Sequence, residues 1–234
     1  MLKSVVIFAG PTLNGLKIDR TEPSDILWLP PARRGDIAKL VSDSESSGVI
    51  GLADGTFHAY PSVSHVELRD AIDKGWRVYG LCSMGAIRAA EMRHLGMIPW
   101  GRVAERFCRD PDFADDEVAL IHGSEDPFVP LSEPLLHIRE FCKAACSRKW
   151  IDSGEAFAVI NSLRERWYGQ RTLDCLRQEL LLATGTTSFS RQLEEALADF
   201  GPYRLKQADL LSFVLARPWL AEPAHSHRRS TQAH

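Results

Sequence analysis

Short apolar runs recur along the first half of this 234-residue sequence, and each run ends at residues that favour a turn. The runs are rich in β-branched side chains and show little polar alternation, which is typical of strands covered on both faces of a sheet. Turn-forming residues such as glycine, proline or Asp-Gly follow most of them. The predicted strands are residues 4–8, 25–29, 49–53, 77–81 and 117–121.

Helical patterns separate several of these strands. Residues 63–74 carry apolar side chains at helical spacing, and Gly75 follows where a helix end favours glycine. Residues 86–95 are apolar at most positions, so we expect this helix to pack against the sheet. Alternation of this kind predicts an α/β fold with a doubly wound, mainly parallel sheet of about five strands.

The pattern becomes purely helical after about residue 126. Ser132 is expected to cap the first of these helices, and Pro134 to lie in its first turn. Residues 222–234 are polar and basic without periodicity, which predicts a disordered tail. We therefore divide the chain into an α/β core at residues 1–125, a C-terminal helical extension at 126–221, and the tail. Further helices of the extension are predicted at residues 157–167, 172–183, 189–200 and 205–216.

The composition is that of a soluble globular protein, with 44% apolar and 25% charged residues. A formal net charge of −3 offers no basic field for nucleic acid, so no nucleic-acid partner is expected. The first apolar run is far too short to cross a bilayer, and it lacks the features of a signal peptide. We expect a cytoplasmic protein that has no membrane partner.

The five cysteines are odd in number and include no Cys-x-x-Cys pair, which argues against a disulfide framework or a zinc knuckle. Cys142 and Cys146 are four residues apart on one helix face, and they could bind a metal or simply pack as small hydrophobes. A metal site built from His58, His65 and Asp54 matches no ligand signature. Neither a phosphate-binding loop nor a dinucleotide fingerprint occurs, so we predict no metal and no cofactor.

Parallel strands expose their carboxyl ends at one edge of a sheet, where ligands bind. The segment with Gly10, Pro11 and Thr12 follows the first strand, and Asp54 and Gly55 follow the third. We therefore predict that the backbone and side chains of these residues contribute to substrate binding. His122-Gly123, after the fifth predicted strand, is a further candidate for this edge.

The turn at residues 82–85 connects the fourth strand to the Ala-rich helix, and it carries two candidate nucleophiles. Ser83 precedes Gly85 by two residues, as in a nucleophile elbow, although Leu81 stands where that motif has glycine. The N–H groups of Met84 and Gly85, at a helix N-terminus, could bind an oxyanion. A thiol at this position, Cys82, can have a lowered pKa. The alternative is that small residues here merely allow close packing and that Cys82 is a buried strand-end residue.

Nearby polar residues could complete a catalytic site. His65 is a candidate general base, and Asp54 could orient it; a surface histidine and a simple turn are the alternatives. Arg88 and Glu91 lie three apart on the helix after the turn. They could pair with each other or line a substrate pocket.

The order of these motifs resembles the TfuA-like family over about residues 5–125. Gly-Pro-Thr-Leu follows the first strand, and Ala-Asp-Gly follows the third. The longest matching piece is Ser83-Met-Gly-Ala-Ile-Arg-Ala-Ala-Glu91, and Gly96-Met97 and Asp115-Asp-Glu-Val-Ala119 come after it. The helical half resembles the family more loosely.

The resemblance implies a role in modifying ribosomally synthesised peptides beside a YcaO-type enzyme, which installs backbone thioamides. It also implies that the chain supplies sulfur by hydrolysing the thiocarboxylate of a ThiS-like sulfur-carrier protein. Ser83 then becomes the candidate nucleophile, with Met84 and Gly85 as oxyanion donors. His65 and Asp54 keep their assignments as base and orienting carboxylate, which rest on their expected position at the sheet edge.

The sequence departs from the family at one point. Where the family commonly has Ala-Ser-Ser-Met-Gly, this chain has Leu81 and Cys82 before Ser83, so a thiol replaces the first serine. If that serine is the essential one in the family, the thiol of Cys82 in its place would make this chain faster, different or inactive. The alternative function is a non-catalytic adaptor that binds YcaO, the carrier, or both.

Overall fold

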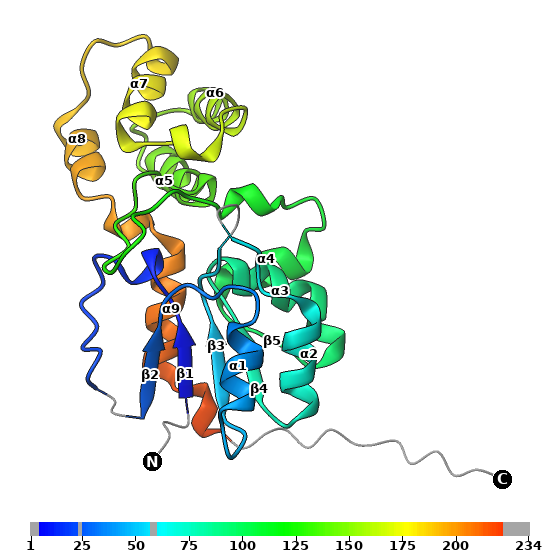
Figure 1. The fold of residues 1–234 in the computed structure, drawn as a ribbon. Coiled ribbons are helices and arrows are strands. Elements are labelled where there is room, and N and C mark those ends of the chain that lie inside the picture. Colours follow the sequence, from blue (N-terminus) through cyan, green and yellow to red (C-terminus); the bar gives the residue numbers. More distant parts are fainter. Residues whose placement is uncertain (1–4, 23–24, 57–59, 222–234) are drawn as a thin grey trace.

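The structure is a computed structural model that describes residues 5–22, 25–56 and 60–221. Its centre is a five-stranded parallel sheet with the strand order β2-β1-β3-β4-β5 (Figure 1). The predicted α/β fold with a parallel sheet is confirmed. The strands are β1 (Val5–Phe8), β2 (Ile26–Leu29), β3 (Val49–Leu52), β4 (Arg77–Gly80) and β5 (Ile98–Pro99).

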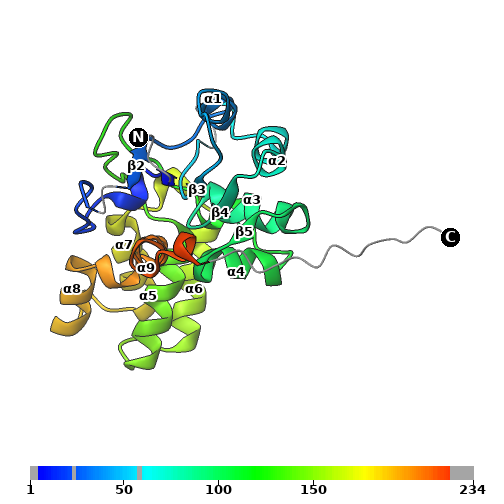
Figure 2. The same cartoon turned by 90° about the horizontal axis from the view of Figure 1, so that it is seen from below.

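Alternating side chains of the strands enter two separate hydrophobic clusters, one on each face of the sheet. Val6 and Phe8 pack with α1 (Asp36–Ser42), α2 (His65–Asp73) and α3 (Met84–Met92). Val5 and Ile7 face the opposite way. Their cluster includes three side chains of α9 (Leu205–Ala216), namely Leu210, Phe213 and Val214. Viewed along the strands in Figure 2, α1 and α2 lie on one side of the sheet and α9 on the other.

The prediction of a strand at residues 117–121 is wrong. Asp115–Glu117 forms a single 3-10 turn, η3, and the segment after it is irregular. Val118 is fully buried against α3, α4 (Gly101–Arg109) and α5 (Leu135–Ser147). A short apolar run can therefore be buried without joining a sheet. The fifth strand is instead the two-residue β5, which pairs with β4.

The predicted helices after residue 126 are confirmed, with shifted bounds. Helices α5, α6 (Ser153–Arg164), α7 (Leu173–Thr184) and α8 (Arg191–Ala198) share their own hydrophobic cluster. Figure 1 shows them beyond the carboxyl ends of the strands. Ser132 does not cap α5, because Pro134 occupies that position. The Ser132 hydroxyl instead accepts a hydrogen bond from the Ile121 N–H at 2.9 Å.

The last helix returns to the sheet. Although α9 follows the helical cluster in sequence, its apolar face packs on β1 and β3. The division at about residue 125 stays a prediction, and α9 shares the hydrophobic core of the sheet. The predicted disordered tail, residues 222–234, lies outside the described residues.

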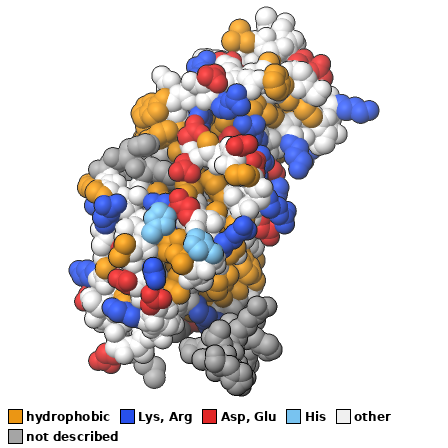
Figure 3. All heavy atoms as spheres, turned by 90° about the vertical axis from the view of Figure 1, so that its right-hand side faces the viewer, with side chains coloured by type: hydrophobic (Ala, Val, Ile, Leu, Met, Phe, Trp, Pro, Cys, Tyr) orange, Lys and Arg blue, Asp and Glu red, His pale blue; other side chains and the backbone are white. Residues whose placement is uncertain are grey.

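The distribution of charged side chains on the surface and the lengths of the helices agree with what the composition predicts. On the face drawn in Figure 3, acidic and basic side chains are interspersed, in keeping with the net charge of −3. Within the described part of the chain, no helix combines the length and the apolar character that crossing a bilayer requires.

Candidate functional site

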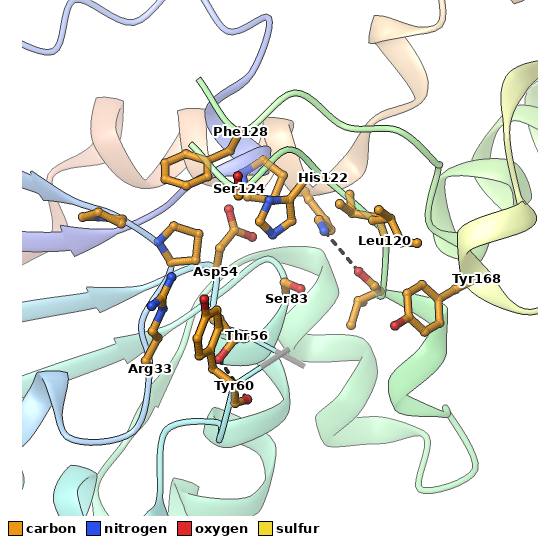
Figure 4. Close-up of a pocket in the computed structure, with 17 residues that line it drawn as sticks. Arg33, Asp54, Thr56, Tyr60, Ser83, Leu120, His122, Ser124, Phe128 and Tyr168 are labelled. Carbon is orange, nitrogen blue, oxygen red and sulfur yellow. Dashed lines mark hydrogen bonds between the residues drawn. The ribbon is translucent and has the colours of Figure 1, made fainter. Parts of the chain in front are cut away.

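A cavity of about 710 Å³ opens at the carboxyl ends of the strands. Its wall combines the sheet edge, the irregular segment after η3, one residue near α7 and one residue of α9. Figure 4 shows Asp54, Ser83 and His122 around this cavity. The lining residues are Pro11, Pro30, Pro31, Arg33, Asp54, Gly55, Thr56, Tyr60, Ser83, Val118, Leu120, Ile121, His122, Ser124, Phe128, Tyr168 and Lys206.

The turn between β4 and α3 separates its two candidate nucleophiles. Cys82 adopts a φ of 63°, a left-handed conformation that is uncommon outside glycine. The N–H of Ser83 consequently folds back on the Leu81 carbonyl at 2.8 Å. Ser83 lines the cavity, whereas the Cys82 side chain belongs to the cluster on the α9 face of the sheet.

The Ser83 hydroxyl is available for chemistry. Ser83 stands at the N-terminus of α3, but its side chain makes no capping hydrogen bond. Within residues 5–22, 25–56 and 60–221 the hydroxyl has no hydrogen-bond partner, and only 3% of the residue is exposed. A serine that is buried at a cavity wall and not used structurally is a good candidate nucleophile.

The two predicted oxyanion donors differ. The Gly85 N–H lies 3.4 Å from the Ala53 carbonyl, to which it donates. The Met84 N–H has no such partner among the described residues, and it begins α3 directly after Ser83. A free N–H at a helix N-terminus favours negative charge. Of the two, Met84 is therefore the available donor.

Cys82 is fully buried away from the cavity. Its thiol donates a hydrogen bond to the Lys206 carbonyl at 3.2 Å. Burial raises the pKa of the Cys82 thiol well above its ordinary value, and the negative charges of Asp209 and Asp54 add to the rise. Since the thiolate is the reactive form, this environment favours Ser83 over Cys82.

Asp54 is engaged in holding the first sheet-edge segment. One carboxylate oxygen accepts the N–H groups of Gly10 and Thr12, each at 2.9 Å. The other accepts the Thr12 hydroxyl at 2.7 Å. These bonds fix the 3-10 turn η1 (Pro11–Leu13) at the edge of the sheet, so that Pro11 lines the cavity. The two predicted substrate-binding segments are thus tied together by Asp54.

The structure does not bring His65 to Ser83. His65 begins α2, and its Nε2 atom lies 2.9 Å from a carboxylate oxygen of Glu91. The Arg88 guanidinium donates to the same oxygen at 2.7 Å and to the Val63 carbonyl at 3.0 Å. None of His65, Arg88 and Glu91 lines the cavity. The structure also corrects the predicted contact between Asp54 and His65, because each is bonded elsewhere.

His122 occupies the position at the cavity that was predicted for His65. Its Nδ1 atom lies 2.7 Å from the Gly123 carbonyl, which makes Nδ1 the donor and leaves Nε2 as an acceptor. Nε2 has no hydrogen-bond partner in the described part of the chain. Phe128 packs edge-on against the imidazole, with ring centroids 5.8 Å apart. The sequence predicted that His122-Gly123 lies at this edge of the sheet, but it did not predict a catalytic role for His122.

Lys206 enters the cavity from α9, a position that no sequence pattern predicted. The side chain is 1% exposed, and its ammonium group donates to the Val118 carbonyl at 3.1 Å, a bond drawn as a dashed line in Figure 4. Burial lowers the pKa of Lys206, while the Asp54 carboxylate acts in the opposite direction. Lys206 is 124 residues from Cys82 in the sequence. A lysine within a helical pattern therefore gives no indication that it lies beside the turn between β4 and α3.

Metal ligands do not cluster in the described part of the chain, where no group of three or more His, Cys, Asp or Glu side chains could hold an ion. Cys142 is buried in the helical cluster, and burial raises the pKa of its thiol to about 12. Cys142 therefore packs as a small hydrophobe. His58 lies outside the described residues.

Comparison with known proteins agrees with the motif order. The family model for TfuA-like proteins matches residues 54–172, just over half of the chain. The matched region includes Asp54, Ser83 and His122 and ends before Lys206. No curated protein matches the chain significantly.

Proposed function

Because the chain belongs to the TfuA-like family, we propose that it hydrolyses the thiocarboxylate of a ThiS-like carrier protein and delivers sulfide to a YcaO enzyme. Family membership supports a role in YcaO-related thioamide biosynthesis. One observation carries the hydrolase proposal. The Ser83 hydroxyl faces a cavity of about 710 Å³ without a structural partner, directly before the unpaired N–H of Met84.

The reaction proceeds through an acyl-serine. The Ser83 oxygen attacks the carbonyl carbon of the thiocarboxylate while His122 Nε2 accepts the hydroxyl proton. The C–S bond then breaks, and sulfur leaves as hydrosulfide with the proton returned by His122. Water hydrolyses the serine ester with His122 again as the base. The products are the carboxylated carrier, free Ser83 and hydrosulfide.

Two groups support the negative charge that develops on oxygen. The Met84 N–H follows the nucleophile, as the oxyanion donor does in a nucleophile elbow. The N-terminal end of α3 adds its positive dipole. Removing one oxyanion donor typically lowers kcat about 100- to 1000-fold, so this end of α3 is a large contributor.

In this scheme His65 and Asp54 act outside the chemical step. Asp54 keeps Pro11 at the cavity by holding η1. His65 ties α2 to α3 through Glu91. His122 makes no hydrogen bond to Ser83 in the described part of the chain, and catalytic hydrogen bonds often tighten only when substrate binds.

Sulfide release from a thiocarboxylated ThiS-like carrier tests the proposal. Ser83→Ala is expected to lower the rate at least about 100-fold, and His122→Asn about 100-fold. Cys108→Ala and His65→Asn, which change residues that do not line the cavity, serve as matched controls and should stay within about threefold of wild type. Full activity of Ser83→Ala would exclude the serine mechanism.

A non-catalytic adaptor is the second candidate, and the absence of a Ser83–His122 hydrogen bond favours it. The same cavity would then hold the carrier tail without cleaving it. Stable binding of the thiocarboxylated carrier without sulfide release identifies the adaptor, as does full stimulation of YcaO by Ser83→Ala. Loss of both sulfide release and YcaO stimulation in that variant identifies the hydrolase.

A further inference from the structure

The ammonium group of Lys206 has donors that the protein does not use. It carries three N–H donors, and the bond to the Val118 carbonyl takes one. Among residues 5–22, 25–56 and 60–221, the other two have no acceptor. Since the residue is 1% exposed and lines the cavity, these donors face the cavity interior. A buried cation in this situation indicates a site for an anion.

The carboxylate of Asp54 makes no hydrogen bond to the ammonium group of Lys206. Asp54 lies on the same cavity wall, and its charge favours the protonated form of Lys206. Its two oxygens, however, are taken by Gly10 and Thr12. None of the hydrogen bonds of the Asp54 oxygens or of the Lys206 ammonium group joins the two side chains. Asp54 thus acts on Lys206 through its charge and not through a direct bond, and two of the ammonium N–H groups stay available to a ligand.

The backbone holds Lys206 beside the nucleophile turn. The Cys82 thiol donates to the Lys206 carbonyl at 3.2 Å, and Ser83 is the next residue along the chain. This contact fixes the start of α9 against the end of β4. A cation from α9 and the hydroxyl of Ser83 therefore meet at one cavity.

We propose that Lys206 is the anion-binding residue of this cavity and selects a carrier tail that ends in a carboxylate or thiocarboxylate over a neutral ester or amide. The identity of the tail rests on the proposed function. A thiocarboxylate is already anionic, and attack by Ser83 adds a second negative charge to the tetrahedral intermediate. A desolvated ammonium group favours both charges and adds to the effect of the Met84 N–H.

Binding of two synthetic peptides tests this proposal. Both carry the last ten residues of the ThiS-like carrier and an N-terminal fluorophore; one ends in a carboxylate and the other in a carboxamide. Fluorescence anisotropy should show at least tenfold tighter binding of the carboxylate by the wild-type chain. Lys206→Met should reduce the preference to twofold or less. Lys143→Met, which removes an exposed lysine of α5, should keep it.

The comparison of the two peptides on the wild-type chain needs no variant, so it can be made even if Lys206→Met fails to fold. In that case Lys206→Gln serves as the second variant with a neutral side chain. Equal binding of both peptides, no binding of either, or a tenfold preference retained without the lysine overturns the anion site. The preference for the carboxylate peptide can depend on Lys206 while sulfide release does not depend on Ser83. This result would exclude the hydrolase mechanism and support the anion site. If hydrolysis depends on Ser83 but the preference for the carboxylate does not depend on Lys206, only the anion-site proposal is excluded.

Discussion

The thiol of Cys82 lies 3.2 Å from the carbonyl oxygen of Lys206, to which it donates a hydrogen bond. This contact directs Cys82 to the α9 face of the sheet and leaves Ser83 as the residue that faces the cavity. Cys82 therefore lies next to the cavity rather than in it.

Cys82 should be unreactive toward thiol reagents in the folded protein. It is fully buried, and burial raises the pKa of its thiol, so little thiolate forms at neutral pH. Cys108 and Cys146 are more accessible. Timed labelling with iodoacetamide, read by mass spectrometry, should modify Cys108 and Cys146 first and Cys82 only after unfolding. Labelling of Cys82 at the rate of Cys146 contradicts this expectation.

The hydrogen bond between Thr12 and Asp54 should contribute measurably to stability. The Thr12 hydroxyl donates to a buried carboxylate, and bonds to a charged group contribute about 1.5–3 kcal/mol. Thr12→Val keeps the shape and removes the bond, so the free energy of unfolding should fall by about 2 kcal/mol. Urea denaturation measures this change.

A second hydrogen bond from a threonine hydroxyl to an aspartate, which is exposed to solvent, provides the control. The Thr21 hydroxyl donates to Asp19 at 2.6 Å, but both residues are exposed. Thr21→Val should change the free energy of unfolding by less than about 0.5 kcal/mol. Equal losses for the two variants would show that burial of Asp54 adds nothing.

Gly85 should not tolerate a side chain. A Cβ atom at this position would lie 1.6 Å from the Leu52 carbonyl oxygen, because α3 crosses β3 in close contact. Gly85→Ala must displace the helix, and the expected loss is about 3 kcal/mol or more. Thermal unfolding of Gly85→Ala and Gly154→Ala compares this site with a glycine near the start of α6, whose near contact is the Asp152 side chain. The control should shift by no more than about 1 kcal/mol.

The clash at Gly85 explains why the turn motif was ambiguous in the sequence. The glycine that resembles part of a nucleophile elbow is required for packing, whatever Ser83 does. The structure thus agrees with the packing interpretation of Gly85, and the catalytic role of Ser83 stays a proposal. The position of Ser83 could be predicted because it depends on local backbone, a strand that ends and a helix that begins.

Other parts of the fold depend on contacts that the sequence pattern does not encode. Strands β1 to β4 were predictable as buried apolar runs. The fifth strand was not, because β5 has only two residues and Ile98 is 37% exposed. His122 and Lys206 reach the cavity from an irregular segment and from α9. Their meeting is a product of tertiary packing, and a lysine in a helical pattern would ordinarily be expected in solvent.

The carboxylate of Asp209 should make stability depend on pH. It accepts the N–H groups of Arg102 and Val103 at 3.0 and 2.8 Å and so caps α4. Burial nevertheless raises the pKa of Asp209 to about 6, from an ordinary value of 3.8, against the opposing effect of those two bonds. The folded chain therefore retains this proton over a pH range in which the unfolded chain has lost it.

Because the native state binds more protons between pH 4 and 6, the contribution of Asp209 to stability falls as pH rises through this range. The full loss is about 3 kcal/mol. Asp209→Asn stays neutral at every pH, so its stability relative to wild type should improve by up to that amount between pH 4 and 7. Urea denaturation at several pH values measures the difference, with the exposed Asp112→Asn as control. A constant difference across the range would mean that Asp209 ionises in the folded chain at its ordinary pKa.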